Sequence, residues 1–310
     1  MESLSVLGSK NRLKKDSLLL FIIVIPFIIY ILMFFYVPIF GWIYSFFDYT
    51  PGFSLGQSKF VGLKYFLMLF TDSDNIISVM KNTFAMSFLV ILCTPVPLVF
   101  AILLNEVRYI KFKRVVQTMT TLPNFISWVI IFSMSFAMFS SEGVLNTLLL
   151  KLQLIKEPLS VLDNPNAVWS FQTFIYLWKF TGWNAIIYIA AIAGIDAELY
   201  EAATVDGAGR FRKVLHITLP GISSTFFVLL LLAISGMLST GGGLDQYFVF
   251  YNGLVSEKIR TLDYYIFQVG ILGASYSYAT AIGMLKSLFS IALLFFANKL
   301  SKAVRGESIF

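Results

Sequence analysis

Residues 201–220 read Glu-Ala-Ala-Thr-Val-Asp-Gly-Ala-Gly-Arg-Phe-Arg-Lys-Val-Leu-His-Ile-Thr-Leu-Pro, a polar and mostly cationic segment between two long apolar runs. Just before it, Asp196 can cap a helix whose first turn contains Glu198, where acidic charge suits the helix dipole. Gly207 and Gly209 allow a sharp change of direction, and Pro220 is expected to stop the second arm and start the next apolar run. The pattern predicts two short helices joined at a glycine elbow, at the inner face of a membrane.

The same segment has a second interpretation, an amphipathic helix that binds only lipid headgroups. Large apolar residues are lacking around Ala202 and Ala203. A flat, small-residue face suits docking to another protein better than insertion into lipid. We therefore favour a docking loop.

The composition indicates a membrane protein. Of 310 residues, 58% are hydrophobic and 13% are charged, whereas soluble domains carry about a quarter charged residues. The single cysteine, Cys93, excludes an intrachain disulfide, and the single histidine, His216, disfavours a histidine-based metal site. We expect no metal and no catalytic residues in this chain.

Long apolar runs predict six transmembrane helices, because about 20 apolar residues are needed to cross the hydrocarbon. The expected spans are Leu18–Phe47, Asn82–Leu104, Val115–Phe139, Ala167–Gly194, Gly221–Thr240 and Ala279–Leu300. The first is too long for a signal-peptide core of about 7–15 residues, so we expect a retained signal anchor. Prolines are expected to kink the spans at Pro26, Pro38, Pro95, Pro97 and Pro123.

Lysines and arginines orient these spans. They gather before the first span, between the second and third, between the fourth and fifth, and after the last: Lys10, Arg12, Lys14, Lys15, Arg108, Lys111, Lys113, Arg114, Arg210, Arg212, Lys213, Lys299, Lys302 and Arg305. Both termini and the 195–220 loop are therefore expected to be cytoplasmic. This distribution explains the net charge of +6 by topology, so we expect no nucleic-acid partner.

The 201–220 segment resembles the loop by which permeases of binding-protein-dependent ABC importers contact their ATPase. The matching positions are Glu201, Ala202, Ala203, Asp206, Gly207, Ala208, Ile217, Leu219 and Pro220, whereas Phe211 replaces the tryptophan usual in the carbohydrate subfamily. From about Tyr36 to Phe310 the chain is similar to carbohydrate permeases of such importers. Segments that carry this similarity include Tyr36-Val37-Pro38, Phe60-Val61-Gly62, Leu104–Arg108, Phe125–Trp128, Gly182–Asn184 and Tyr278–Ala281.

The resemblance implies an all-α, type I ABC importer permease that lies in the bacterial plasma membrane and imports carbohydrate, with an oligosaccharide as the expected substrate, by alternating access. It implies a second permease chain, expected to differ from this one, two copies of a cytoplasmic ABC ATPase, and a lipid-anchored or periplasmic sugar-binding protein. No Gly-x-x-x-x-Gly-Lys-Ser/Thr phosphate loop occurs here, so ATP and Mg²⁺ are expected on the ATPase. The implied segments are a cytoplasmic tail (1–17), a first helix with an outer interfacial segment (18–76), a permease core (77–304) and a C-terminal tail (305–310).

Sugar sites combine aromatic rings with amides and hydroxyls. The candidates for the substrate pathway are Asn124 and Trp128 in the third span, and Trp178, Lys179, Trp183 and Asn184 in the fourth. Lysines such as Lys179 and Lys286 are costly in hydrocarbon unless they face water, a partner or the interface, so both are open to an alternative role, either snorkelling to the interface or an inter-helix bond.

Two other functions stay open. A secondary carrier for a small polar solute would need no ATPase, but the spans are poor in the carboxylates that proton coupling uses, and no repeat of about 100 residues is visible. A membrane enzyme would need grouped catalytic side chains, and only Glu201 and Asp206 qualify by residue type. The permease is the favoured interpretation.

Overall fold

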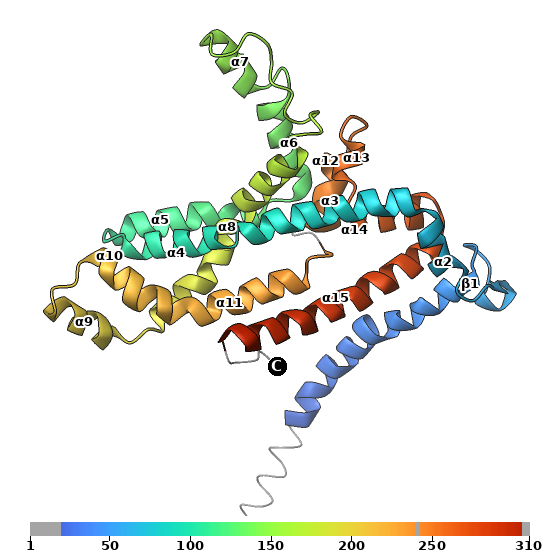
Figure 1. The fold of residues 1–310 in the computed structure, drawn as a ribbon, viewed down its shortest axis with the longest axis horizontal. Helices are drawn as coiled ribbons and strands as arrows, with labels where there is room; N and C mark the ends of the chain where they lie inside the picture. Colours follow the sequence, from blue (N-terminus) through green and yellow to red (C-terminus); the bar gives the residue numbers. More distant parts are fainter. Residues whose placement is uncertain (1–19, 240–241, 306–310) are drawn as a thin grey trace, which may run out of the picture. The chain divides into compact units, whose positions relative to one another are not determined.

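The computed structural model describes residues 20–239 and 242–305, and it is almost entirely helical (Figure 1). Expectations for the tail 1–17 and its four cations, for the span ends at Leu18 and Thr240, and for residues 306–310 fall outside the described residues. The chain forms two compact units. Within the described residues, one contains 20–68 and Val269–Met284, and the other contains Leu69–Gln268 and 285–305.

The helices of the described chain follow one another with few strands. After a helix over residues 20–31, the elements are η1 Leu32–Tyr36, η2 Val37–Phe46, β1 Phe47–Asp48, η3 Leu55–Gln57, β2 Lys59–Phe60, α2 Lys64–Thr71, α3 Ser73–Leu92, α4 Pro95–Glu106, α5 Ile110–Thr121, η4 Leu122–Phe125, α6 Trp128–Phe139, α7 Val144–Lys151, α8 Val168–Ala193, α9 Ala197–Val205, α10 Arg210–Lys213, η5 Val214–Thr218, α11 Leu219–Ser235, α12 Gly243–Phe250, α13 Ser256–Ile259, α14 Leu262–Phe267, η6 Gln268–Leu272 and α15 Tyr276–Arg305.

The prediction of six spans is confirmed. Helices long and apolar enough to cross a membrane run over Leu20–Phe46, Ser73–Glu106, Trp128–Lys151, Val168–Ala193, Arg210–Ser235 and Tyr276–Lys299. The expected third span, Val115–Phe139, is not one helix. Its chain breaks at Leu122–Ser127, where Pro123 lacks a backbone donor, and the candidate span begins after the break, at Trp128.

The other prolines act unequally. Pro38 stands where the first span changes from a π turn to a 3₁₀ helix, and Pro95 and Pro97 begin α4 after a break at Cys93–Thr94. Pro26 lies inside regular helix, so the expected interruption there is wrong.

The smaller unit contains a short antiparallel hairpin in which Phe47 lies opposite Phe60. The buried Tyr65 hydroxyl donates a 2.5 Å hydrogen bond to Asp48, and the Lys64 ammonium lies 3.7 Å from the same carboxylate. The Tyr65 hydrogen bond, supported by the nearby lysine, holds the pKa of Asp48 below its usual value. Burial and the Asp48 carboxylate raise the pKa of Tyr65 to about 12.

This pair predicts an acid-sensitive contribution to stability. Because the pKa of Asp48 is lower in the folded chain, its contribution is present above the unfolded pKa of about 3.9 and is lost as pH falls through the folded value. Tyr65→Phe removes the hydroxyl and keeps the ring. We expect the difference in melting temperature between the original chain and Tyr65→Phe, measured in detergent, to be smaller at pH 3 than at pH 7. An equal difference at both pH values would show that the hydrogen bond does not stabilise the carboxylate.

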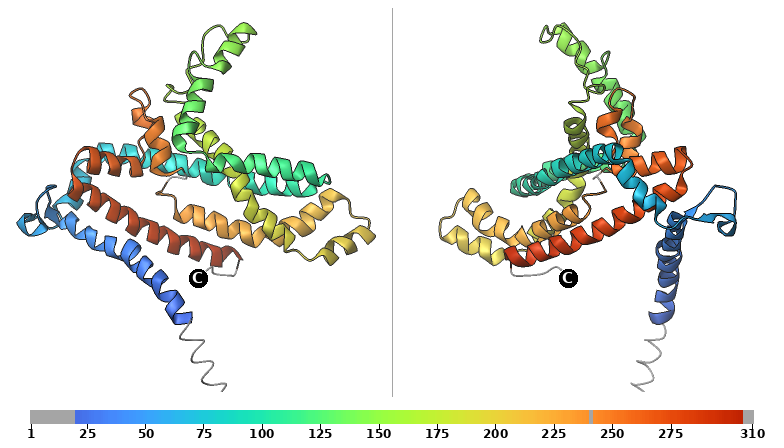
Figure 2. Two further views of the ribbon diagram at one scale, coloured as in Figure 1. Left: turned by 180° about the vertical axis from the view of Figure 1, so that it is seen from behind. Right: turned by 45° about the vertical axis from the view of Figure 1, so that its right-hand side comes forward.

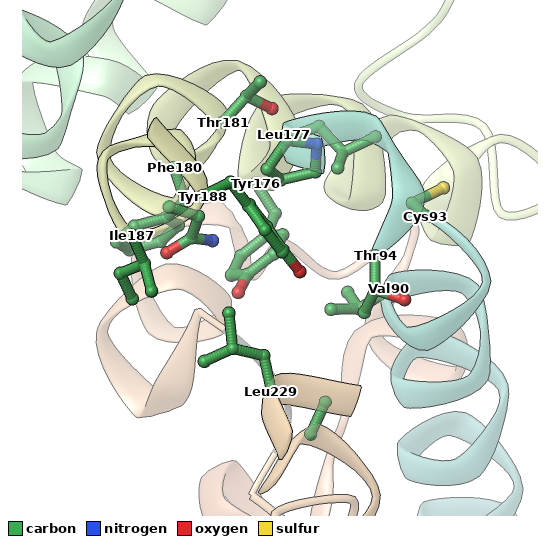
Figure 3. Close-up of a pocket in the computed structure, with 13 residues that line it drawn as sticks. Val90, Cys93, Thr94, Tyr176, Leu177, Phe180, Thr181, Ile187, Tyr188 and Leu229 are labelled. Carbon is green, nitrogen blue, oxygen red and sulfur yellow. The ribbon is translucent and has the colours of Figure 1, made fainter. Parts of the chain in front are cut away.

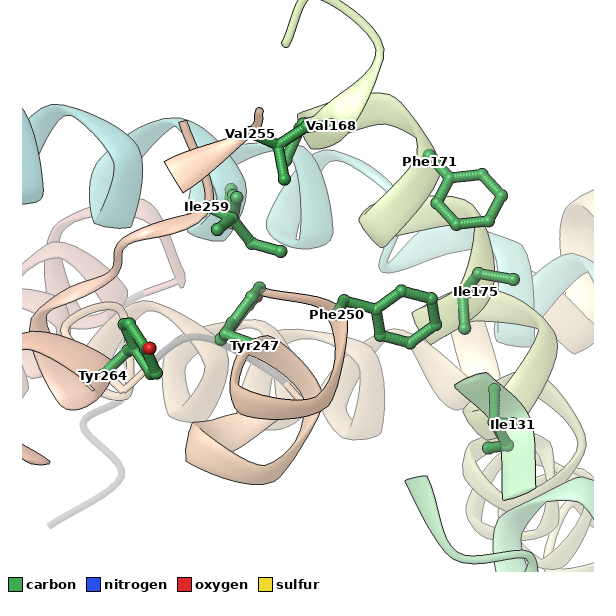
Figure 4. Packing of buried hydrophobic residues seen from close by; sticks show 10 residues of the cluster. Ile131, Val168, Phe171, Ile175, Tyr247, Phe250, Val255, Ile259 and Tyr264 are labelled. Atoms are coloured by element: carbon green, nitrogen blue, oxygen red, sulfur yellow. The ribbon is translucent and has the colours of Figure 1, made fainter. Parts of the chain in front are cut away.

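The core of the larger unit joins helices far apart in sequence. One buried cluster brings Met86 of α3 and Ile131 of α6 together with α8 and the segment after α11 (Figure 4); its remaining buried members are Val168, Phe171, Ile175, Tyr247, Phe250, Val255, Ile259 and Tyr264. A second cluster packs Leu98 and Ala101 of α4 and Ala185 and Tyr188 of α8 against Ile222 of α11. Helix α8 contributes to both clusters and is the central element of this unit.

Polar side chains of α3 hold the segment between α11 and α15. The buried Asn82 amide donates to the carbonyls of Glu257 and Arg260, at 2.7 and 3.1 Å, and the Ser87 hydroxyl donates to the carbonyl of Met237 at 2.6 Å. Lys286 of α15 pairs with Asp263 of α14. In the structure, Lys286 therefore forms an inter-helix bond. This is one of the roles that its sequence position left open.

Candidate functional site

The 195–220 loop folds as a hairpin of two helical arms. Asp196 caps α9 by accepting a 3.0 Å hydrogen bond from the Glu198 amide, as its sequence position predicted. The arms are joined by hydrogen bonds between side chains: the Tyr200 and Thr218 hydroxyls lie 2.9 Å apart, and the Lys213 ammonium donates to the Thr204 hydroxyl at 2.5 Å. Figure 2 shows α9 and the helix that begins at α10 as the two arms.

The elbow between the arms is a Schellman turn. The Ala208 amide donates to the Ala203 carbonyl at 2.8 Å, and the Gly207 amide donates to the Thr204 carbonyl at 3.1 Å. Gly207 has a φ of +74°, the left-handed conformation that this turn requires and that L side chains adopt at a cost. Open space surrounds the position where a Cβ would stand. The glycine is therefore needed for its backbone conformation, and the elbow presents a free surface.

The second arm differs from the expectation, because Pro220 does not stop it. Helix α10 continues through the π turn η5 into α11, so that Arg210–Ser235 is one continuous span. Pro220 has no backbone donor, and it stands directly after a wider turn in which the Leu219 amide donates to the Val214 carbonyl, five residues back. The arm is thus rigidly joined to the membrane helix.

The nine predicted coupling residues fall into two groups. Glu201, Ala202, Asp206 and Gly207 are exposed around the elbow, and Ala203 and Ala208 are half-buried within it. Ile217, Leu219 and Pro220 lie farther along the second arm. Val205 and Phe211 add two exposed apolar side chains near the elbow, 89% and 78% exposed. The sequence analysis did not single out Val205, although a large apolar residue next to a polar turn was visible.

A cavity of about 180 Å³ lies between the α3–α4 break, α8 and α11 (Figure 3). Helix α8 supplies Tyr176, Phe180, Asn184 and Tyr188 at four-residue spacing, and α11 supplies Leu229 and Ala233. The Asn184 amide is hydrogen-bonded to the Tyr176 hydroxyl. Thr94, Thr181 and Cys93 also line the cavity. Aromatic rings, hydroxyls and an amide are the groups that bind an uncharged polar ligand.

The structure distributes the six predicted pathway residues over three places. Asn184 lines the cavity. Trp178 lines a separate apolar cavity between α6 and α8. Lys179 and Trp183 contact the break between α5 and α6, to which Asn124 and Trp128 belong. Sequence reasoning missed Tyr176, Phe180 and Tyr188, which the four-residue spacing from Asn184 along one helix could have found.

The described chain thus has six candidate spans, a polar helical hairpin between the fourth and fifth, and a cavity between the two helices that this hairpin connects, as expected for a multi-pass membrane protein. Residues 93–306 match the family described as "Binding-protein-dependent transport system inner membrane component". The chain belongs to this family, and it is a multi-pass protein of the cell membrane with the fold of an ABC importer permease.

Individual relatives cover nearly the whole chain. Protein LplB of Bacillus subtilis (strain 168) is 39% identical over 96% of this chain and 92% of its own length. The polygalacturonan/rhamnogalacturonan transport system permease protein YteP of the same organism is 38% identical over 94% of this chain and 90% of its own. A chain in the crystal structure of a bacterial alginate ABC transporter, in complex with an alginate pentasaccharide-bound periplasmic protein, is 31% identical. It superposes with a TM-score of 0.84 over 95% of this chain and 98% of that chain.

Proposed function

We propose that this chain is the permease subunit of an ATP-driven importer that moves oligosaccharide across the cell membrane. Several similar proteins are named for saccharide transport, among them YteP and, at 30% identity over 91% of this chain, the arabinooligosaccharides permease AraP of Bacillus subtilis (strain 168). Tyr176, Phe180, Thr181 and Asn184 in the cavity are suited to a sugar, with rings for its apolar faces and polar groups for its hydroxyls.

One observation carries the mechanism. The 195–220 loop directly joins the two helices that face each other across the cavity, α8 and α11. Because the second arm continues as α11 without a break, a force on the loop is transmitted to a cavity wall. An ATPase that grips Glu201, Ala202, Ala203, Asp206, Gly207 and Ala208 and pushes on Ile217, Leu219 and Pro220 would rock these walls and alternate access to the cavity.

The proposal includes partners and an orientation. The cavity, at about 180 Å³, is smaller than the roughly 300–1,000 Å³ of sites that enclose small ligands, so an oligosaccharide needs walls from a second permease. Two cytoplasmic ATPases would bind ATP and Mg²⁺ and act on the loops, and a lipid-anchored or periplasmic binding protein would deliver the sugar. The distribution of lysines and arginines supports a cytoplasmic position for the 195–220 loop and both termini.

The deciding experiment is purification of the tagged chain from native membranes in mild detergent, followed by quantitative mass spectrometry. We expect a second six-span permease and an ATPase in stoichiometric amounts. Recovery of the chain alone or as a homomer across several mild detergents would contradict the ATP-driven mechanism and favour an ion-coupled carrier. The binding protein that accompanies the complex would then be used to identify the glycan.

Asn184→Leu tests the cavity as part of the sugar pathway. The change keeps nearly the same volume and removes the amide, so a sugar hydroxyl there loses a hydrogen bond worth about 1 kcal/mol or more. We expect uptake of the glycan recovered with the binding protein to fall about fivefold or more. Ile187→Leu, a volume-conserving change in the same cavity wall, serves as the control and is expected to leave uptake near normal. Equal uptake in Asn184→Leu and the original chain would remove Asn184 from the pathway.

A further inference from the structure

Lys179 lies in the middle of α8, and its side chain is buried, with 5% exposure. Its ammonium donates to three backbone carbonyls, those of Pro123 at 3.1 Å, Asn124 at 3.0 Å and Ile126 at 2.5 Å. A lysine ammonium has three N–H donors. Its whole donor capacity is therefore used by one short segment of backbone, the break between α5 and α6.

The Pro123 carbonyl also accepts a 3.1 Å hydrogen bond from the Ile126 amide, but the Ile126 carbonyl lies where the helix is interrupted. In a regular helix the Ile130 amide would bond to Ile126, but here it bonds to the Ser127 hydroxyl, which caps α6. The Ile126 carbonyl is thereby left to the Lys179 ammonium. Non-helical backbone at membrane depth persists only where its polar groups are satisfied within the protein. Lys179, which lies on a neighbouring helix, donates hydrogen bonds to these polar groups.

Aromatic rings complete the surroundings of the charge. The Lys179 nitrogen lies 5.2 Å from the centre of the Trp128 ring and 5.5 Å from that of the Phe180 ring. Carbonyl oxygens and ring faces both attract an ammonium group. The lysine thus contacts the break at its beginning, through Pro123, and at its end, through Trp128.

A second contact, one turn farther along α8, brings the same elements together. A Cβ added to Gly182 would lie 2.1 Å from the Thr120 carbonyl oxygen, so the backbones of α8 and α5 touch there. The Trp183 ring meets the Phe125 ring edge-on at 5.7 Å. One face of α8 is therefore fixed to the α5–α6 break over Lys179, Gly182 and Trp183.

The adjoining face of the same turns lines the cavity, through Tyr176, Phe180, Asn184 and Tyr188, and Phe180 contacts both the cavity and the Lys179 ammonium. We propose that Lys179 is a positioning residue: its ammonium clamps the α5–α6 break to α8 and thereby sets the rotation of the α8 face that lines the cavity. In this role the lysine does not contact the transported solute. The inference depends on these contacts alone and not on the identity of the solute.

The test uses the intact complex in detergent or nanodiscs and needs no substrate. Hydrogen–deuterium exchange reports on the break through peptides that cover residues 122–130, and the native Cys93, which lines the cavity opposite α8, reports on the cavity through its rate of modification by N-ethylmaleimide. In Lys179→Met the carbonyls of Asn124 and Ile126 lose the lysine donor, and the Pro123 carbonyl keeps only its bond from the Ile126 amide. We expect exchange in 122–130 to become about tenfold faster or more, and Cys93 modification to become faster as well.

Two further variants distinguish loss of the Lys179 contact with the α5–α6 break from a general loss of stability. Lys179→Arg keeps the charge and the donors, and we expect it to restore both readouts toward the original values. Lys286→Met removes another lysine of the larger unit, one that pairs with Asp263 elsewhere, and we expect it to leave exchange in 122–130 and Cys93 modification unchanged.

If Lys179→Met does not accumulate, Lys179→Gln, which keeps two donors, is measured in its place. Unchanged exchange and unchanged Cys93 modification in Lys179→Met or Lys179→Gln would overturn the proposal. The same change in Lys286→Met would also overturn it, because the effect would then follow any loss of charge. Failure of the carbohydrate assignment would leave all of these results unaffected.

Discussion

Replacement of Gly207 by valine is expected to abolish most ATP-driven uptake while the chain still inserts into the membrane. Gly207 adopts a φ of +74° at the Schellman turn of the elbow, and a β-branched residue there costs roughly 1–3 kcal/mol of backbone strain. Relief of that strain breaks the two bonds that close the turn, to Ala203 and Thr204, and displaces the docking surface. We expect uptake and co-purified ATPase to fall about tenfold or more.

Gly207→Asn is the matched control, because asparagine tolerates the left-handed conformation. The position is open, so the asparagine side chain meets no atom within 4 Å at its Cβ. We expect Gly207→Asn to retain most of its bound ATPase and uptake. Normal uptake and complex assembly in Gly207→Val would show that the elbow does not couple the chain to an ATPase.

Replacement of Gly182 by alanine is expected to destabilise the larger unit strongly. The new Cβ would lie 2.1 Å from the oxygen and 2.3 Å from the carbon of the Thr120 carbonyl. Both are backbone atoms, so a change of rotamer cannot relieve the overlap and α8 must move away from α5. Overpacking costs about 1–3 kcal/mol, and we expect the upper end of this range, measured as a lower melting temperature in detergent.

Gly283→Ala is the control for this substitution. Gly283 lies within α15, and an added Cβ meets nothing within 4 Å. Alanine in an open helix position is expected to be neutral or to stabilise by about 0.5–1 kcal/mol. A melting temperature of Gly182→Ala close to that of Gly283→Ala would contradict the close contact of α8 with α5.

Much of the architecture could be predicted from the sequence, because the length and apolar content of a span are local properties. It predicted the fourth span as Ala167–Gly194, and the helix runs over Val168–Ala193. It also predicted the cap at Asp196 and the turn at Gly207, since a helix cap and a left-handed glycine depend on residues within a few positions of each other.

The predictions that failed depended on structure beyond the few neighbouring residues that a sequence pattern describes. Val115–Phe139 looked like one apolar span, yet the chain breaks at Leu122–Ser127, where Pro123 lacks a donor and Lys179 of another helix donates to the carbonyls. Pro220 looked like a helix stop, yet the arm continues through a π turn into α11. Local rules describe what proline removes from a helix, but not what the surrounding structure restores.

The sequence by itself determined the class of this protein: six helices long enough to span a bilayer, and a polar loop with a glycine elbow between the fourth and fifth. Only the tertiary structure decided which side chains share a site. It placed Lys179 at the α5–α6 break and Asn184 at the cavity, although they are only five positions apart on one helix. The physical reason is that spacing along a helix fixes the face on which a residue lies, whereas packing against helices distant in sequence fixes what that face meets.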